Sequence, residues 1–345
     1  MEKGNLHRWV EQLDTGMKYK RGLGIESTAH TFGVSIVDER GTILSNVKEV
    51  YKPPSGKGIH PREASRHHAE KAPKLIGDAL KAAALAIDDM DFIAYSAGPG
   101  LGPCLRVGAT LARALSVYYN KPIIPVHHGV GHIELGCLLT GSSDPVVLLL
   151  SGGHTMILVS GIRSWVVFGE TLDLTLGQLI DQFGRAIGYS SPAGPSIEKL
   201  ARDGKKYVTL PYVVKGNDLS FSGMLTSIKK ELSRPYEDLA FSLQETAFAM
   251  VAEVSERALA LTGKRELLVV GGVAANARLS EMLNHVADRQ GAAIKPIPIA
   301  FAGDCGAQIA WPGILYNKAG ISAKAEDAFV NQSWRIDRVS VPWRS

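Results

Sequence analysis

Cysteine, long apolar runs and net charge are all scarce in this sequence of 345 residues. Cys104, Cys137 and Cys305 stand far apart and form no CxxC pair, which argues against a disulfide framework and a cysteine-based zinc site and favours a reducing, cytoplasmic compartment. No apolar run reaches the roughly 20 residues that a membrane span needs. Even the run at 145–150 is followed at once by serine and glycine. We therefore expect no contact with a membrane.

The net charge is small because 38 lysines and arginines face 34 aspartates and glutamates, which gives +4 at pH 7. Such a balance permits contact with an anionic polymer without demanding it. The basic residues are scattered, and the densest local group is Lys48, Lys52, Lys57, Arg62 and Arg66. We expect the chain alone to bind a nucleic acid weakly, with Arg62 and Arg66 on the contact surface because they lie on one helical face.

What is present in the sequence points to a folded protein of two lobes. Hydrophobic residues make up 45% of the chain, which is enough for a sizeable core. The length exceeds that of one ordinary domain of about 150 residues. Residues 1–20 form a polar leader without the apolar stretch of a secretory signal, and we expect this leader to pack weakly, with Met17 as an alternative start.

One pattern of strands and helices occurs twice along the chain. The first copy predicts strands and helices in the order 23–27, 31–37, 42–51 (strands), 62–85 (helix, kinked or broken at Pro73), 91–95 (strand), 105–119 (helix) and 122–126 (strand). The second copy predicts strands at 146–150, 154–159 and 164–168, helices near 176–187 and 239–261, a strand at 266–270 and a helix at 277–290. Each copy opens with a strand, a small polar turn and a His-Thr pair, and each later has a strand that runs into glycine.

Duplicated ribonuclease-H-like lobes with such glycine turns are typical of the actin, sugar-kinase and heat-shock-ATPase superfamily, in which a nucleotide lies between the lobes. The pattern therefore predicts an α/β protein with the actin-like ATPase superfold, and two generic α/β domains are the alternative. We expect an N-terminal lobe at 21–127 plus 310–345, and a C-terminal lobe at 128–309 with an insertion near 190–218.

The sharpest local motif is His128-Gly129-Val130-Gly131-His132, at the end of an apolar strand. Histidines four residues apart on a helix share one face, which suits two ligands of one metal ion; a solvated helix face would show the same spacing. A zinc peptidase of the His-Glu-x-x-His kind needs a glutamate directly after the first histidine. Gly129 stands there, so the motif argues against proteolysis.

Two glycine turns that follow strands, 151–153 and 271–276, are candidates for phosphate binding. Glycine lets backbone N–H groups approach phosphate oxygens, and a helix that begins after Asn276 adds a favourable dipole. Asp181 and Glu198 lie between the turns and can accept hydrogen bonds from ribose hydroxyls. Ordinary tight turns and ordinary surface acids are the alternative, so the hypothesis depends on the paired placement of the turns.

Six motifs taken together resemble the tRNA threonylcarbamoyladenosine transferase family. They are residues 24–31 (GIESTAHT), 58–64 (GIHPREA), 98–108 (GPGLGPCLRVG), 168–173 (FGETLD), 220–223 (SFSG) and 271–276 (GGVAAN). The resemblance covers residues 22–343. Residues 222–226 and 331–335 are most similar to the archaeal and eukaryotic branch, whose members are catalytic subunits of the KEOPS assembly.

The resemblance implies an enzyme that transfers a threonylcarbamoyl group from threonylcarbamoyl-adenylate to the exocyclic amine of the adenosine 3′ of the anticodon, in tRNAs that read codons beginning with A. It implies one metal ion, iron(II) or zinc, held by His128, His132 and Asp304. It also implies an adenine nucleotide, either the adenylate or ATP with magnesium. The implied nucleotide-binding residues are Leu149, Leu150, Ser151, Gly152, Gly153, Asp181, Gly194, Glu198 and Asn276.

The implied partners are tRNA, KEOPS-type subunits that include a small protein kinase, and a synthase that supplies the adenylate. Two other functions stay open at this point: an ATPase or small-molecule kinase of the same superfold, and a nucleotide-sensing scaffold subunit.

The sequence departs from the family pattern at four positions. Leu149 stands where archaeal relatives usually carry a tyrosine that can reach the metal, so we expect a site with three protein ligands. Gln178 stands for an asparagine, Ala193 for a glycine and Cys305 for another asparagine, and none of these changes removes an expected charge.

Overall fold

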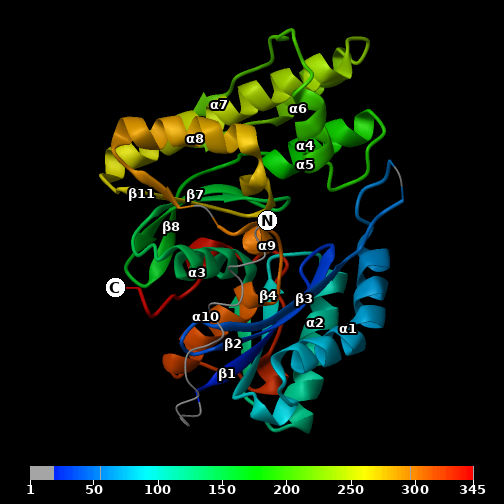
Figure 1. The fold of residues 1–345 in the computed structure, drawn as a ribbon, viewed down its shortest axis with the longest axis vertical. Helices are drawn as coiled ribbons and strands as arrows, with labels where there is room; N and C mark the ends of the chain where they lie inside the picture. The colour runs from blue at the N-terminus through cyan, green and yellow to red at the C-terminus, as the bar shows by residue number, and fades with distance from the viewer. Residues whose placement is uncertain (1–18, 55, 296, 345) are drawn as a thin grey trace, which may run out of the picture.

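The computed structural model describes residues 19–54, 56–295 and 297–344. The predicted leader lies outside these ranges, apart from Tyr19 and Lys20. No helix in the described part of the chain combines the length and the apolar character that crossing a membrane requires. Figure 1 shows two sheets, one above the other, each with its own helices, and the helix α3 (His128–Thr140) between them.

The first sheet has five strands in the order β3-β2-β1-β4-β5. These strands are β1 (Arg21–Glu26), β2 (Thr31–Asp38), β3 (Ile43–Val50), β4 (Phe92–Gly98) and β5 (Ile123–His127). β1, β2 and β3 are antiparallel neighbours, whereas β4 and β5 continue the sheet in parallel with β1. The helices α1 (Pro61–Ala83) and α2 (Gly102–Tyr118) pack on one face and α10 (Ala307–Lys318) on the other. Covered on both faces, β1, β2 and β4 are almost wholly buried.

The second sheet repeats this plan in the order β12-β11-β6-β7-β8. Its strands are β6 (Val146–Leu150), β7 (Thr155–Gly161), β8 (Ser164–Glu170), β11 (Glu266–Val270) and β12 (Ala293–Lys295). β6, β7 and β8 are antiparallel neighbours, and β11 and β12 are parallel to β6. The helices α7 (Tyr236–Thr262) and α8 (Ala277–Gln290) share a core with one face, and α3 shares a core with the other.

Smaller elements complete the chain. The second unit also holds α4 (Leu176–Ala186), α5 (Gly194–Ala201), α6 (Ser222–Lys230), α9 (Ile299–Ala302) and the two-stranded pair β9 (Val214–Lys215) and β10 (Asp218–Leu219). Short 3-10 helices lie at η2 (Ile87–Asp89), η3 (Gly272–Ala275), η4 (Ala325–Asp327) and η5 (Ile336–Arg338).

The two sheets have the same strand order and the same strand directions, so the predicted duplication and the α/β actin-like fold are confirmed. The predicted break at Pro73 is wrong, because α1 continues through this residue. A proline inside a helix removes one backbone N–H, and here the ring lies on the exposed side of α1, where it meets no neighbouring element.

The last described residues contact both sheets. Ala323 pairs with Ile123 of β5, and the Asn331 N–H donates to Ala97 O at the end of β4. Farther along, Ile336, Val339 and Val341 are buried in the core that α3 shares with the second sheet. The boundaries of the two lobes stay a prediction.

Candidate metal centre and nucleotide cleft

The helix α3, which carries both candidate histidine ligands, begins with an unusual cap. His127 Nδ1 accepts hydrogen bonds from the N–H groups of Gly129 and Val130, at 3.1 and 3.3 Å. Its Nε2 lies 3.0 Å from Trp334 O, and these contacts together define one tautomer, in which Nε2 donates and Nδ1 accepts. Burial lowers the pKa of His127 to about 4, so the ring stays neutral and keeps this cap at ordinary pH.

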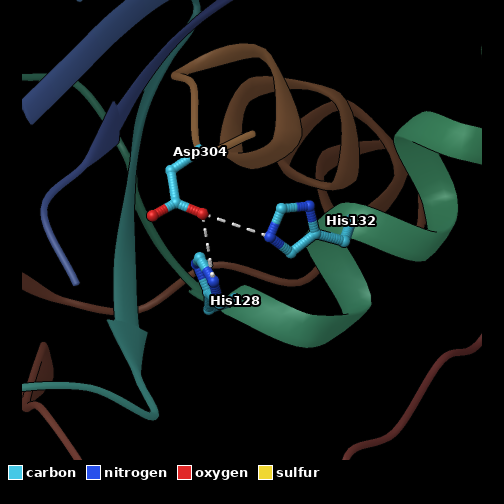
Figure 2. Close-up of side chains that lie close together, drawn as sticks. All are labelled: His128, His132 and Asp304. Carbon is cyan, nitrogen blue, oxygen red and sulfur yellow. Dashed lines mark ion pairs between the residues drawn. The ribbon is translucent and has the colours of Figure 1, made fainter. Parts of the chain in front are cut away.

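Close packing between α3 and α10 brings Asp304 to the histidines. A Cβ at Gly131 would lie 2.3 Å from Gln308 O, so only glycine permits this approach of the two helices. Asp304 precedes α10, and its Oδ1 lies 3.6 Å from His128 Nε2 and 3.3 Å from His132 Nε2. Figure 2 shows the three side chains pointing toward one another. The candidate ligand atoms all lie within 4.8 Å of one another.

These distances suit a metal ion. Zinc ligands lie about 2.0–2.2 Å from the ion, so neighbouring corners of the tetrahedron are about 3.3–3.6 Å apart. His132 Nε2 is buried and has no hydrogen-bond partner among the described residues, although a buried polar atom normally has one. Two imidazoles and one carboxylate form a donor set that binds iron(II) or zinc and leaves positions open for substrate. The residues present therefore fit a metal ion at this position.

Glu26, at the end of β1, contacts His128 through Nδ1, whereas Asp304 lies near Nε2 of the same ring. Its Oε2 lies 2.9 Å from His128 Nδ1, and its Oε1 accepts from the Thr28 backbone N–H. Burial alone would lower the pKa of His128, but the charge and hydrogen bond of Glu26 outweigh it and raise this pKa to about 9. With Nδ1–H given to Glu26, Nε2 is the atom that faces Asp304. A carboxylate behind a histidine is the usual support of a metal-binding imidazole.

The pKa values of the other two candidate ligands are both lowered, but for different reasons. Burial lowers the pKa of His132, which favours the neutral ring that a metal ion needs. Burial would raise the pKa of Asp304, but His132 and His128 lower it well below its usual range, so this carboxylate is ionised.

The two glycine turns lie side by side at the ends of neighbouring parallel strands. β6 and β11 are paired through Leu149 and Val270, and a Cβ at Gly271 would lie 2.2 Å from Leu150 O. Gly271 also has a φ of 94°, which favours glycine. Gly152 and Gly153 are exposed, so the backbone of this turn is free to meet a ligand. One nucleotide can reach both turns.

The remaining predicted nucleotide residues surround these turns, and most of them already have protein partners. Asp181 Oδ1 accepts from the Ala193 N–H at 2.7 Å, next to Gly194, and Glu198 Oε1 accepts from the Ala277 N–H at 3.2 Å. Asn276 caps α8 through its side-chain oxygen, and its amide donates to Gln244 Oε1 at 2.7 Å. The side chains of Leu149 and Leu150 are buried in the cores on opposite faces of the second sheet, so only their backbone can face a ligand.

A sequence comparison decides the family. Residues 42–311 match the profile of the tRNA N6-adenosine threonylcarbamoyltransferase family. The chain is 50% identical to the tRNA N6-adenosine threonylcarbamoyltransferase of Caldivirga maquilingensis over 323 residues, which are 93% of this chain and 97% of the relative. It is 49% identical to the protein of that name from Ignicoccus hospitalis over 326 residues, or 93% and 99% of the two chains. The chain belongs to this family. It is therefore a transferase that modifies tRNA, as the sequence predicted.

Solved structures with low sequence identity share the fold of this transferase. HypF of T. kodakarensis superposes with a TM-score of 0.63 at 14% identity, over 87% of this chain and 48% of HypF. The activator of 2-hydroxyisocaproyl-CoA dehydratase from Clostridium difficile, solved with bound ADPNP, gives 0.51 at 12% identity, over 88% and 98% of the two chains.

Three residues of the transferase site went unrecognised in the sequence: Glu26, Gln308 and His154. Gln308 Nε2 lies 3.3 Å from Glu26 Oε2, and its Oε1 accepts from the Cys305 N–H, beside Asp304. The His154 ring stacks on that of His128, with centroids 6.2 Å apart. His154 and Glu26 each lie in or beside the small polar turn that opens one copy of the duplicated pattern. These matching positions in the two copies are the sequence feature that could have identified Glu26 and His154 as site residues.

Proposed function

We propose that this transferase moves a threonylcarbamoyl group from threonylcarbamoyl-adenylate to the N6 amine of the adenosine 3′ of the anticodon, in tRNAs that read codons beginning with A. We propose further that it works as the catalytic subunit of a KEOPS-type assembly with a small protein kinase among its partners. A separate synthase supplies the adenylate. The family membership and the archaeal relatives support this assignment.

The observation that best supports an acyl-adenylate substrate is a series of contacts between the candidate metal centre and the glycine turn 151–153. The His154 ring stacks on His128, and the His154 backbone N–H donates to Ser151 Oγ at 3.0 Å. The turn 151–153 therefore lies next to the metal ligands. An acyl-adenylate has its reactive carbonyl beside its phosphate, so one such molecule would span both places.

The chain's own residues would bind and orient this substrate. Exposed backbone at Gly152, Gly153 and Gly272 would bind the phosphate, as glycine turns do in other nucleotide sites. Asp181 and Glu198 would lie on the ribose side. A bound iron(II) or zinc ion would supply a Lewis acid that polarises the carbonyl of the transferred group. Holding the two reactants in place supplies a large part of such a rate enhancement.

The fold relatives support an adenine nucleotide in the cleft, since one of them was solved with bound ADPNP. ATP with magnesium would bind at the same turns, which keeps ATP hydrolysis as a second activity to measure. Ser151 Oγ accepts from the Gly153 and His154 N–H groups and so keeps this turn in shape before a phosphate arrives.

Transfer of labelled threonine to an unmodified tRNA tests the proposal. The reaction would contain the synthase, ATP, bicarbonate, the partner subunits and this chain. We expect Asp304→Asn to lower transfer at least about a hundredfold, because it weakens a metal ligand. Binding of tRNA by the same variant should stay unchanged. Hydrolysis of ATP with no transfer by the wild-type assembly would instead favour the ATPase function.

A further inference from the structure

The N-terminal end of α7 extends past the edge of the second sheet. α7 has 27 residues and is about 40 Å long, whereas β11 has five residues and spans about 16 Å. A short turn joins the end of α7 to β11, which then runs to Gly271, so the N-terminal end of α7 lies on the side of the glycine turns. Gln244 of α7 meets Asn276 at the level of the glycine turns. The eight residues 236–243 therefore reach about 12 Å beyond that level.

Six basic residues surround this protruding end, and we call them the α7 basic cluster: Arg202, Lys205, Lys206, Lys229, Lys230 and Arg234. All six are exposed. Lys229 and Lys230 end α6, and the others lie in the segments that follow α5 and α6; Figure 1 shows these two helices beside the same end of α7. Asp238 in the first turns of α7 accepts the backbone N–H groups of Lys205 and Lys206, at 2.7 and 2.9 Å.

Five carboxylates accompany the six basic residues of the cluster, which leaves this region a net charge of about +1. Arg202 pairs with Glu198 and Arg234 with Glu231. Within the described ranges the four lysines of the cluster form no ion pair. Asp203, Glu237 and Asp238 are the other acids in this region, and Asp238 is buried against the backbone N–H groups of two of those lysines.

The surface that the sequence favoured differs little by the same criterion, because four of its basic residues also form no ion pair among the described residues: Lys48, Lys52, Lys57 and Arg62. Arg66 of α1 lies 2.7 Å from Glu63 and 3.8 Å from Glu70, so two carboxylates offset its charge. Ion pairs of this kind compete with phosphate contacts.

Two exposed aromatic rings accompany the α7 basic cluster. Tyr207 is 52% exposed and Tyr236 42% exposed. The Tyr207 hydroxyl lies 2.8 Å from Thr246 Oγ1 on α7, which holds the ring beside the helix. Unstacked bases of single-stranded RNA stack on such rings, while lysines bind the phosphates.

We propose that the α7 basic cluster, with Tyr207 and Tyr236, binds the backbone and unstacked bases of the tRNA substrate beside the glycine turns. The inference rests on the proposed function, since it assigns a surface to the substrate of the same site. A phosphate backbone is favoured over an acidic protein because four lysines without ion pairs and two exposed rings lie beside the N-terminal part of α7.

A charge-reversal variant tests this surface. In Lys205→Glu/Lys206→Glu/Lys229→Glu/Lys230→Glu we expect the affinity of the full chain for an unmodified tRNA to fall at least about tenfold at 0.1 M salt. The slope of log K against log salt should fall by about 0.7–0.9 for each lost phosphate contact. Metal and nucleotide binding should match the wild type, which shows that the variant folds.

Lys318→Glu/Lys324→Glu is the control, because both lysines are exposed on the other unit. It should leave tRNA affinity unchanged. Equal affinity and salt slope in the cluster variant and the wild type would overturn the proposal, and loss of binding to a partner subunit with unchanged tRNA binding would assign the surface to a protein instead. Failure of the wild-type assembly to modify tRNA would count against the proposed function, whereas normal transfer with an unchanged KM for tRNA in the cluster variant would count only against this surface.

Discussion

Glu26 determines which nitrogen of His128 is available to a metal ion. It accepts the Nδ1 proton at 2.9 Å, and the same carboxylate is fixed by Thr28 and Gln308. Because all of these groups are buried, the ring cannot exchange Glu26 for water. The ligand geometry therefore depends on a residue that does not itself touch the metal site.

We expect Glu26→Gln to weaken metal binding about 10–100-fold, because an amide supports the imidazole less well than a carboxylate. Titration of the purified, metal-free protein with zinc measures this. Ser35→Ala on β2 is the control, since Ser35 is buried in the same sheet and contacts Asn46 rather than a ligand. Wild-type zinc affinity in the glutamine variant would show that Glu26 has no such role.

His68, on α1, gives the protein a pH-dependent stability. Burial lowers its pKa to about 4, against about 6.5 in an unfolded chain. Between these values the unfolded state binds more protons, so the free energy of unfolding falls as the pH drops from 6.5 toward 4. From pH 7 to pH 5 the loss from this group is about 2 kcal/mol.

His68→Gln removes this titration and should lose less stability over the same interval. Denaturant unfolding of both proteins at pH 7 and pH 5 measures the difference. Equal losses in the two proteins would show that His68 does not titrate in this range.

The three candidate metal ligands that the structure brings together could be named from the sequence, but the residues that support them could not. His128 and His132 have a recognisable spacing, and the family resemblance adds Asp304. Glu26 lies 102 residues from His128 and has no spacing signal, because the contact exists only once β1 and α3 meet across the two units.

At the scale of single elements, α3 is held at its N-cap and near its middle by the last described segment. Trp334 O meets the N-cap residue His127, and Arg344 meets Glu134 in the second turn. Arg344 forms two hydrogen bonds to Glu134, at 2.8 and 2.9 Å, and lies over the Trp165 ring at 4.2 Å. Glu134 also accepts from Trp165 Nε1. The helix that carries the two candidate histidine ligands is therefore held against Trp165 of β8.

Removal of either charge alone should destabilise the protein by about 3–5 kcal/mol, because the partner would stay buried without compensation. The side chains of Arg344 and Glu134 are only 11% and 4% exposed. We expect each single variant, Arg344→Met and Glu134→Leu, to lose this much free energy of unfolding, as measured by denaturant unfolding.

The double variant Arg344→Met/Glu134→Leu should recover much of that loss, since no unpaired charge remains. Strictly additive losses would show that the pair is not coupled. Lys74→Met, which breaks an exposed pair with Asp78, serves as a comparison with an expected effect below about 1 kcal/mol.

Elements with strong periodicity were predictable, and those defined by tertiary contact were not. The sequence predicted α7 and β11 because long apolar patterns mark them. β12 has only three residues and forms by pairing with β11, so its sequence carries little strand signal. α10 was also missed, since it is apolar on nearly every side and lacks the polar face of an ordinary surface helix.

At the scale of the whole molecule, the metal site links ligand binding to global stability. A ligand that binds only the folded state, at a hundred times its Kd, stabilises that state by about 2.7 kcal/mol. For 345 residues this corresponds to a rise of about 4 °C in Tm. We therefore expect zinc to raise the Tm of the metal-free protein and a chelator to reverse the change.

His132→Ala should abolish this rise, because it removes a ligand. Thermal scans of both proteins with and without zinc measure it. A zinc-dependent rise of equal size in the variant would place the stabilising ion elsewhere in the molecule.

The crossings of the chain between its two sheets meet at the metal ligands. In the described part of the chain there are three: α3 with His128, the segment before α10 with Asp304, and residues 331–336, which touch α3 through Trp334. A rotation of one unit against the other would turn about these contacts. Displacement grows with distance from an axis, so the candidate metal ligands would move least. A relative rotation of the two units is thus compatible with a candidate metal centre that stays in place.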